Sequence, residues 1–240
     1  MSPRFTLHYW PIPFRAQPLR YLLAYADVPW QESETDALVA LYKAEPEAQP
    51  LPFMGFPILH DREADLWLSQ MPAIAGYLGS LSGLMPSDSG KAAETYKVLG
   101  DVSDVLQAMT LDCGAQMWTP EAWEAFAQDR FLQWLQIFEV NGQGHGLAAD
   151  SGTLLGTPEP GVADLACAAL WVTMAEKLPK LEALIAKGAP LVWSLSNRIA
   201  AHPRIAALRA EQQSAWGEVW CEGEIEQSLR SALAAWDPTP

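Results

Sequence analysis

The stretch FTLHYWPIPFRAQPLRYLLAYADVPW, residues 5–30, contains the change of structure that decides the fold. It opens with a weak alternation of apolar and polar residues that stops at Pro11, which predicts a short strand. Apolar residues then recur at helical spacing, with Pro18 early in the helix, where its missing N–H costs little. The residues on that spacing are Leu19, Leu22, Leu23 and Ala26. Tyr9 therefore lies where a strand ends and the turn into a helix begins.

The residues after this stretch complete a small mixed unit of strands and helices. VPWQES (28–33) has the composition of a second short strand, and residues 42–57 are proline-rich and predicted to be irregular. PILHD (57–61) and LWLSQ (66–70) flank a polar turn and predict a hairpin. A further helix is predicted from the apolar spacing of Ile74, Leu78 and Leu81. We therefore expect a first domain, 1–82, with the order strand, helix, strand, loop, hairpin, helix.

Residues 82–90 have the composition of a linker, and the chain after them carries only helical patterns. Apolar stripes at helical spacing occur at Leu99, Val102, Leu106 and Met109, at Phe131, Trp134, Leu135 and Phe138, at Leu165, Ala169 and Leu170, and at Val192, Leu195 and Ile199. The spacing of Ile225, Leu229 and Leu233 predicts an extra terminal helix. The predicted fold class is α/β plus all-α, with a second domain, 91–240, made of helices.

The composition of the chain narrows the classes of partner. The chain has 240 residues and is 50% apolar, which is enough for a sizeable core in one large domain or two modest ones. Its net charge of -14 disfavours nucleic acid and anionic membrane surfaces as partners. The cysteines Cys113, Cys167 and Cys221 have no metal-ligand spacing, and such a sparse, odd set fits a reducing compartment. With neither a signal-peptide pattern nor an apolar run of membrane-spanning length, we expect a cytoplasmic protein without a metal.

Five segments, in their order and spacing, together resemble the cytosolic glutathione transferases of the tyrosine type. They are YWPIPFRAQPLR (9–20), GFPILHD (55–61), LSQMPAIAGYL (68–78), GVADLACAALW (161–171) and NRIAAHPRIAAL (197–208). The likeness covers almost the whole chain. It implies an N-terminal thioredoxin-like domain (1–82) that binds glutathione, followed by a helical-bundle domain (91–240) that contributes the electrophile site.

The resemblance makes Tyr9 the catalytic residue, whose hydroxyl donates a hydrogen bond to the sulfur of glutathione. A free thiol has a pKa of about 8.5, so little of it is ionised at neutral pH. Lowering that pKa by about two units needs roughly 2.7 kcal/mol, and one charge-assisted hydrogen bond supplies about 1.5–3 kcal/mol. The N-terminus of the following helix adds to this stabilisation. The alternative role of Tyr9 is a strand-end tyrosine half buried against the second domain.

The resemblance also implies which residues hold glutathione: Arg15, Lys43, Phe56, Pro57, Gln70 and Met71. Pro57 matches a cis-proline that turns the backbone of Phe56 toward the cysteinyl amide of glutathione. Arg15 matches a basic position in the strand–helix turn, whereas Lys43 lies in a loop and has exposed solvation as its alternative role. Gln70 fits the family pattern, but Met71 stands where a serine or threonine usually helps helix amides to bind the γ-glutamyl carboxylate. Losing that bond would cost about 1.5–3 kcal/mol, which predicts glutathione binding weaker by roughly ten- to a hundredfold.

The expected lining of the electrophile site is Trp10, Ile12, Met109 and Cys113, although each of them could instead serve in core packing. Asp164 matches the capping position of a buried helix, and we interpret it as a folding residue. Phe53 matches an aromatic residue that some classes insert into a partner subunit, which favours a homodimer.

The resulting prediction is a glutathione transferase, with a role in detoxification, that joins its co-substrate glutathione to hydrophobic small molecules. The alternative is a non-catalytic or weakly active glutathione-transferase-like binding protein, which Met71 favours. A thiol–disulfide or dehalogenase-like relative is disfavoured because the turn after the first strand contains neither cysteine nor serine. An interaction module within an assembly is a third alternative, because a fold does not fix a function.

Overall fold

The sheet of the first domain is built around β1 (Phe5–His8), the strand predicted at the start of the chain. A computed structural model describes residues 3–237 and has four strands in the order β2-β1-β3-β4. β2 (Trp30–Glu32) pairs with β1 in parallel, through the crossover helix α1 (Gln17–Tyr25). β3 (Ile58–Asp61) and β4 (Leu66–Ser69) continue the sheet in antiparallel fashion. The predicted strands, first helix and hairpin are therefore confirmed, and together they make a thioredoxin-like domain.

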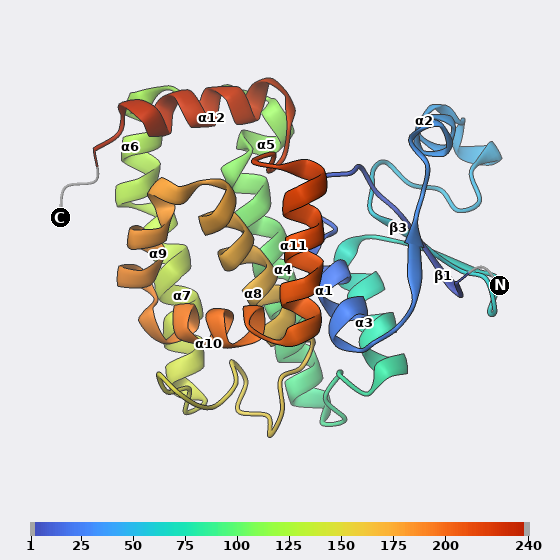
Figure 1. The fold of residues 1–240 in the computed structure, drawn as a ribbon, viewed down its shortest axis with the longest axis horizontal. Helices are drawn as coiled ribbons and strands as arrows, with labels where there is room; N and C mark the ends of the chain where they lie inside the picture. The colour runs from blue at the N-terminus through green and yellow to red at the C-terminus, as the bar shows by residue number, and fades with distance from the viewer. Residues whose placement is uncertain (1–2, 238–240) are drawn as a thin grey trace.

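One helix of this domain was not predicted. The segment after β2 forms α2 (Thr35–Lys43), and the proline-rich segment that follows contains the short 3₁₀ helix η1 (Pro46–Ala48). The prediction that β2 leads through a loop to the hairpin is thus wrong for α2. Only Leu38 of α2 is buried, so this helix packs on the domain through a single buried side chain. In Figure 1, α2 lies at the outer end of the sheet, away from α1 and α3.

Up to residue 237, the regular elements after α3 (Met71–Ser82) are all helices, and α3 itself is capped by Gly83 with a φ of 71°. The helices that follow are α4 (Ser89–Met109), α5 (Leu111–Gly114), α6 (Pro120–Gln128), α7 (Arg130–Gly144), α8 (Val162–Lys177), the 3₁₀ helix η2 (Pro179–Leu181), α9 (Glu182–Gly188), α10 (Pro190–Ala200), α11 (Pro203–Trp216) and α12 (Gly223–Ala235). All four predicted stripes lie in helices of this set, and the predicted terminal helix is α12. α5, α6 and α9 were not predicted.

Helix α8 forms the centre of the helical domain, and almost all of its residues are buried. Its start is fixed by Asp164, whose carboxylate accepts the N–H of Gly161 at 2.9 Å and the N–H of Leu154 at 2.7 Å. This arrangement agrees with the interpretation of Asp164 as a folding residue. The indole ring of Trp171 packs edge-on against Phe131 and Phe138 of α7, so large aromatic side chains fill the space between these helices.

The two domains meet along a wide interface in which α1 packs against α8 and α11 (Figure 1). The buried side-chain amides of Gln17 and Gln212 bond to each other across it, at 2.6 and 3.2 Å. The backbone of the linker also takes part, because Leu84 accepts the N–H of Val162 at 3.1 Å. These contacts hold the sheet against the helical bundle and fix the site that lies between them.

Candidate functional site

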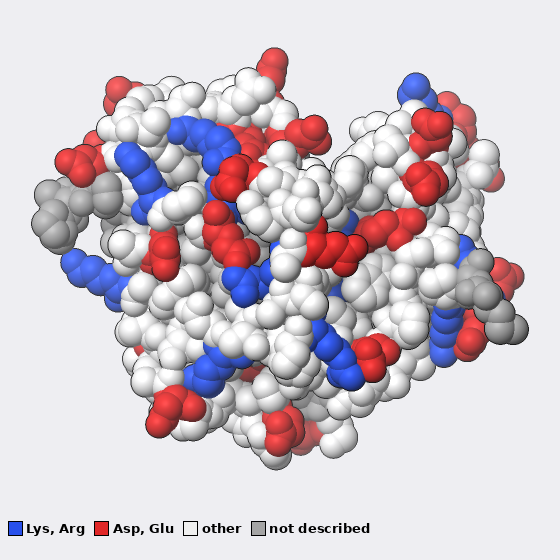
Figure 2. Space-filling model, in the orientation of Figure 1, with Lys and Arg blue, Asp and Glu red and all other residues white. Residues whose placement is uncertain are grey.

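The ends of three strands gather the predicted site residues at one edge of the sheet. In the register of the sheet, His8 pairs with Ile58, and Ile58 pairs with Ser69. Tyr9, Pro57 and Gln70 are the residues directly beyond this row, so segments far apart in sequence reach the same edge. Figure 2 shows a hollow in the surface between the α2 side of the first domain and the helical domain.

The turn after β1 is held from inside by Arg20, a residue of α1 that is 1% exposed. Its guanidinium donates to the carbonyl oxygens of Ile12 at 2.7 Å and Trp10 at 3.2 Å, and it pairs with Glu32 of β2 at 2.8 Å. Prolines in this turn cannot donate to a strand partner, so the sheet pairing stops here. Arg20 replaces that pairing and gives the turn a defined shape.

The hydroxyl of Tyr9 has one partner within residues 3–237, the backbone N–H of Arg15, which donates to it at 3.0 Å. A phenol can accept one hydrogen bond and donate another, so the proton of Tyr9 is left free to be donated. Burial raises the pKa of Tyr9 to about 12, with hydrogen bonding and positive charge from Arg15 opposing part of that rise. Tyr9 is therefore protonated at neutral pH and can act as a donor. The side chain is only 4% exposed.

The side chain of Arg15 points toward the helical domain. Its Nη2 atom lies 2.6 Å from Oε1 of Gln107 on α4 and 3.3 Å from Sγ of Cys113 on α5. All residues of α5 have positive φ values, between 44° and 83°, which makes it a left-handed turn that only its glycine adopts without strain. This turn brings the exposed thiol of Cys113 to the guanidinium of Arg15.

Phe56 and Pro57 are joined by a cis peptide bond, as the resemblance implies. The ring of Phe56 packs edge-on against that of Trp10, with ring centres 5.6 Å apart. It also contacts the ring of Phe53, whose centre is 5.5 Å away. Phe53 thus packs within its own chain, while its neighbour Met54 is 94% exposed.

The N-terminus of α3 supplies the remaining predicted glutathione residues. Gln70 caps the helix with a φ of 73° and a ψ of 116°, a strained backbone for a residue other than glycine, and such strain is common where ligands are held. Met71 begins the helix and is 5% exposed. The free N–H groups of this first turn can bind an anion. Lys43 instead lies at the end of α2 and is exposed, and its ammonium group has no hydrogen bond or ion pair within residues 3–237.

The residues predicted for the electrophile site are not all brought together. Cys113 is exposed beside Arg15, and Trp10 is partly exposed beside Phe56. Ile12 is 6% exposed and packs within the turn. Met109 is fully buried, so it belongs to the core rather than to an open surface.

Sequence reasoning missed Arg20, Gln107 and Glu226. Each acts through a partner distant in sequence or through the backbone of a loop, so no local motif identifies it. The only signal is for Glu226, an acidic residue in the first turn of a helix.

The described part of the chain offers no other obvious chemical centre. All three cysteines are free thiols, and Cys167 is fully buried. Within residues 3–237 there is no group of three or more His, Cys, Asp or Glu side chains that could hold a metal ion. The same residues include no helix with the length and apolarity to cross a membrane.

Comparisons with known proteins agree with this architecture. A Pi-class glutathione S-transferase of Onchocerca volvulus has a similar structure, with a TM-score of 0.71 and 19% identity over 92% of this chain and 98% of that one. Prostaglandin synthase D of Nilaparvata lugens gives a TM-score of 0.67 and 18% identity over 87% of this chain and 98% of that one. At these identities the likeness establishes the fold alone. No curated protein sequence matches the chain.

The sequence itself provides the assignment to a family. Residues 94–232, more than half of the chain, match the family described as "Glutathione S-transferase, C-terminal domain". This match covers the helical domain from α4 to α12. The chain therefore belongs to the glutathione S-transferase family.

Proposed function

We propose that this protein is a tyrosine-type glutathione transferase that joins the thiolate of glutathione to hydrophobic electrophiles. In this reaction the thiol proton leaves to solvent, and the sulfur forms a bond to an electrophilic carbon as the leaving group departs or the carbon's π bond opens. Tyr9 donates its hydroxyl proton as a hydrogen bond to the sulfur and keeps it ionised. Hydrophobic electrophiles would enter from the helical side, beside Trp10 and Cys113.

The observation that carries this proposal is the state of the Tyr9 hydroxyl. Its acceptor position is filled by the N–H of Arg15, and its raised pKa keeps the proton in place. The N–H also polarises the phenol toward donation, because hydrogen bonds in a chain strengthen one another. A group in this state suits the stabilisation of an anion and cannot serve as a general base at neutral pH.

The peptide part of glutathione has a matching place at the same edge of the sheet. The backbone of Phe56, directly before Pro57 at this edge, would pair with the cysteinyl amide. The N-terminus of α3, with Gln70 at its cap, would bind the γ-glutamyl carboxylate. We also propose a homodimer, as is typical of this family, with a second copy of the chain covering the groove between α4 and α7.

The first prediction concerns Tyr9→Phe, which removes the proposed donor and keeps the ring. We expect the pKa of enzyme-bound glutathione to rise by about two units and the conjugation rate at neutral pH to fall by roughly a hundredfold. Glutathione affinity should change little, because the peptide contacts remain. Calorimetry with glutathione, and conjugation of a chlorinated nitrobenzene followed by absorbance, give the two quantities.

The matched control is Tyr21→Phe, because Tyr21 is a fully buried tyrosine of α1 whose hydroxyl has no hydrogen-bond partner within residues 3–237. It should leave the conjugation rate unchanged. Equal rates for wild type and Tyr9→Phe would exclude the proposed role of the hydroxyl.

A second candidate, a non-catalytic glutathione-binding protein, is favoured by Met71, which supplies no hydroxyl to the carboxylate. It predicts measurable glutathione binding with a negligible rate for both the wild type and Tyr9→Phe. Absence of any glutathione binding would exclude both candidates.

A further inference from the structure

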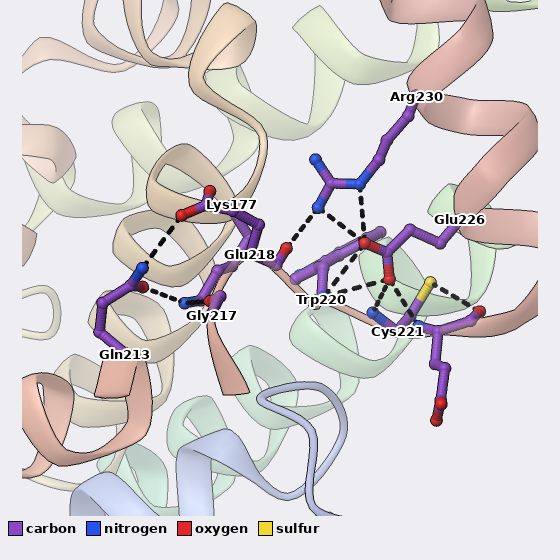
Figure 3. Close-up of polar contacts among 9 residues, drawn as sticks. Lys177, Gln213, Gly217, Glu218, Trp220, Cys221, Glu226 and Arg230 are labelled. Atoms are coloured by element: carbon purple, nitrogen blue, oxygen red, sulfur yellow. Dashed lines mark hydrogen bonds and ion pairs between the residues drawn. The ribbon is translucent and has the colours of Figure 1, made fainter. Parts of the chain in front are cut away.

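The connection between α11 and α12, residues 217–222, is held by a single buried carboxylate (Figure 3). We call this connection the strap. Oε2 of Glu226 accepts three consecutive backbone N–H groups, from Trp220 at 3.1 Å, Cys221 at 2.9 Å and Glu222 at 2.6 Å. Oε1 accepts Nε of Arg230 at 2.8 Å. One side chain therefore accepts the last three backbone N–H groups of the strap.

The bonds to Glu226 are charge-assisted. The residue is 6% exposed, and burial alone would raise the pKa of its carboxyl group. The hydrogen bonds from the backbone of residues 220–222 and from the side chain of Arg230 together outweigh burial and lower that pKa. Glu226 is therefore ionised at neutral pH, and bonds to an ionised acceptor are about twice as strong as neutral ones.

Two further side chains hold the first residues of the strap. Lys177, which is 3% exposed, donates to the carbonyl oxygen of Gly217, and Arg230 donates to that of Glu218 (Figure 3). The strap ends at Glu222, whose φ of 66° is unfavourable for a residue with a side chain. A strained backbone persists only where its surroundings hold it, and here the N–H of that residue is bonded to Glu226.

The strap carries Trp220 against the turn that contains Tyr9. The Trp220 indole is 1% exposed and packs edge-on against the ring of Phe14, with ring centres 5.0 Å apart. Phe14 directly precedes Arg15, whose N–H donates to the Tyr9 hydroxyl. The fixed strap thus supports the donor that sets the orientation of the Tyr9 proton.

We propose that Glu226 is a positioning residue for thiolate formation: it folds the strap, and the strap presses Trp220 against Phe14 and holds the N–H of Arg15 on the Tyr9 hydroxyl. This inference rests on the proposed function of Tyr9. It adds a residue of the terminal helix, remote from the sulfur, that controls how well the sulfur is ionised.

The test compares Glu226→Gln with Glu224→Gln, an isosteric change that removes the same charge from an exposed position on the same helix. Hydrogen exchange followed by mass spectrometry reports on the amides of residues 220–222, and the ultraviolet absorbance of the thiolate reports on bound glutathione. In Glu226→Gln we expect these amides to exchange roughly tenfold faster and the pKa of bound glutathione to rise by about one unit. kcat/KM at neutral pH should fall about five- to tenfold and recover at higher pH, while glutathione affinity stays within about twofold. Glu224→Gln should match the wild type.

Arg230→Gln is the second variant, for the case in which Glu226→Gln does not fold, and it should shift both readouts in the same direction by smaller amounts. Faster exchange with an unchanged thiol pKa would show that the strap is merely structural and would overturn the inference. Unchanged exchange would overturn it as well. A wild-type protein that does not ionise bound glutathione would overturn the proposed function, and the inference with it. If the wild type ionises bound glutathione and both variants show the same pKa for its thiol as the wild type, the inference alone is overturned.

Discussion

Met71 lies at the helix N-terminus that we propose binds the γ-glutamyl carboxylate of glutathione. It begins α3, where free N–H groups can bind a carboxylate, but its side chain adds no hydrogen bond and is buried. The structure places the helix terminus at the same edge of the sheet as Tyr9 and Pro57. Backbone amides alone would therefore bind the γ-glutamyl carboxylate.

We predict that Met71→Ser binds glutathione more tightly than the wild type. A hydroxyl that bonds to the carboxylate contributes about 1.5–3 kcal/mol, which corresponds to roughly ten- to a hundredfold in affinity. The loss of a buried methionine should at the same time reduce the free energy of unfolding by about 2 kcal/mol or more. Calorimetry and denaturant unfolding measure the two effects.

Met71→Ala is the control, because it leaves a similar cavity but adds no hydroxyl. If alanine and serine change glutathione affinity equally, the side chain at this position does not reach the carboxylate.

At single positions, the sequence predicted where a residue lies and its backbone geometry better than it predicted the contacts of its side chain. The cis bond at Pro57 is confirmed, and Tyr9 lies at the strand end where it was expected. The guanidinium of Arg15, however, bonds to Gln107 and Cys113 of the helical domain. Those atoms come close only through the packing of one domain on the other, and the spacing of residues along the chain carries no information about it.

Among helices and strands, predictability followed the length of the apolar stripe. The long helices α4, α7 and α8 show several turns of apolar spacing, whereas α2 buries one residue and α9 buries one. The left-handed α5 has leucine, aspartate and cysteine at positive φ, and this combination of residues does not predict a left-handed turn. Tertiary contacts, rather than local preference, decide these short elements.

Asp61 joins β3 to two other segments of the first domain. Its buried carboxylate accepts Nε of Arg4 at 2.9 Å, Nη2 of Arg4 at 2.6 Å and the hydroxyl of Tyr77 on α3 at 2.6 Å. The hydrogen bond from Arg4 is the largest cause that holds the pKa of Asp61 below its usual value, and the bond from Tyr77 adds to it. The charged carboxylate is thus more stable in the folded protein than in the unfolded chain.

We predict that this carboxylate makes stability depend on pH in the acid range. A lowered pKa in the folded state stabilises the protein above the pKa of the unfolded chain, about 3.9, and that stability is lost as pH falls further. Asp61→Asn should be less stable at neutral pH by about 2–3 kcal/mol and should lose less stability between about pH 5 and 2. Urea unfolding at a series of pH values measures both effects.

Asp65→Asn is the matched control, since Asp65 lies in the same hairpin and its side chain is 96% exposed. It should reproduce the wild-type pH profile. An Asp61→Asn profile parallel to that of the wild type would show that other carboxylates cause the acid instability.

The order of the two domains and the change to an all-helical chain were predicted from the sequence, whereas their mutual placement was not. The interface depends on the pairing of Gln17 with Gln212 and on the packing of α1 against α8. The proposed site lies between the domains, and its helical side stays a prediction: Cys113 is exposed beside Arg15, whereas Met109 lies in the core. Surfaces that face another molecule are harder still, because exposure cannot be read from one sequence.

The proposed homodimer can be tested at the groove between α4 and α7. This groove has a volume of about 540 Å³ and is lined by Lys97 of α4 and by residues of α7 that include Ile137 and Val140. Val140 is 64% exposed and Ile137, three residues earlier on the same helix, is 41% exposed, so the two side chains form an apolar surface patch. A second copy of the chain would bury this surface, and an interface of standard size covers about 800 Å² on each partner.

We predict that Val140→Lys converts a dimeric wild type into a monomer, because a lysine ammonium buried without a partner costs several kcal/mol. Sedimentation equilibrium across a range of protein concentrations measures the mass. Met117→Lys introduces the same change at another exposed apolar position, 42% exposed, and should leave the mass unchanged. If Val140→Lys sediments as a dimer like the wild type, the dimer contact lies on another surface, such as the loop that exposes Met54. If the wild type is itself a monomer at every concentration, this groove does not join two copies.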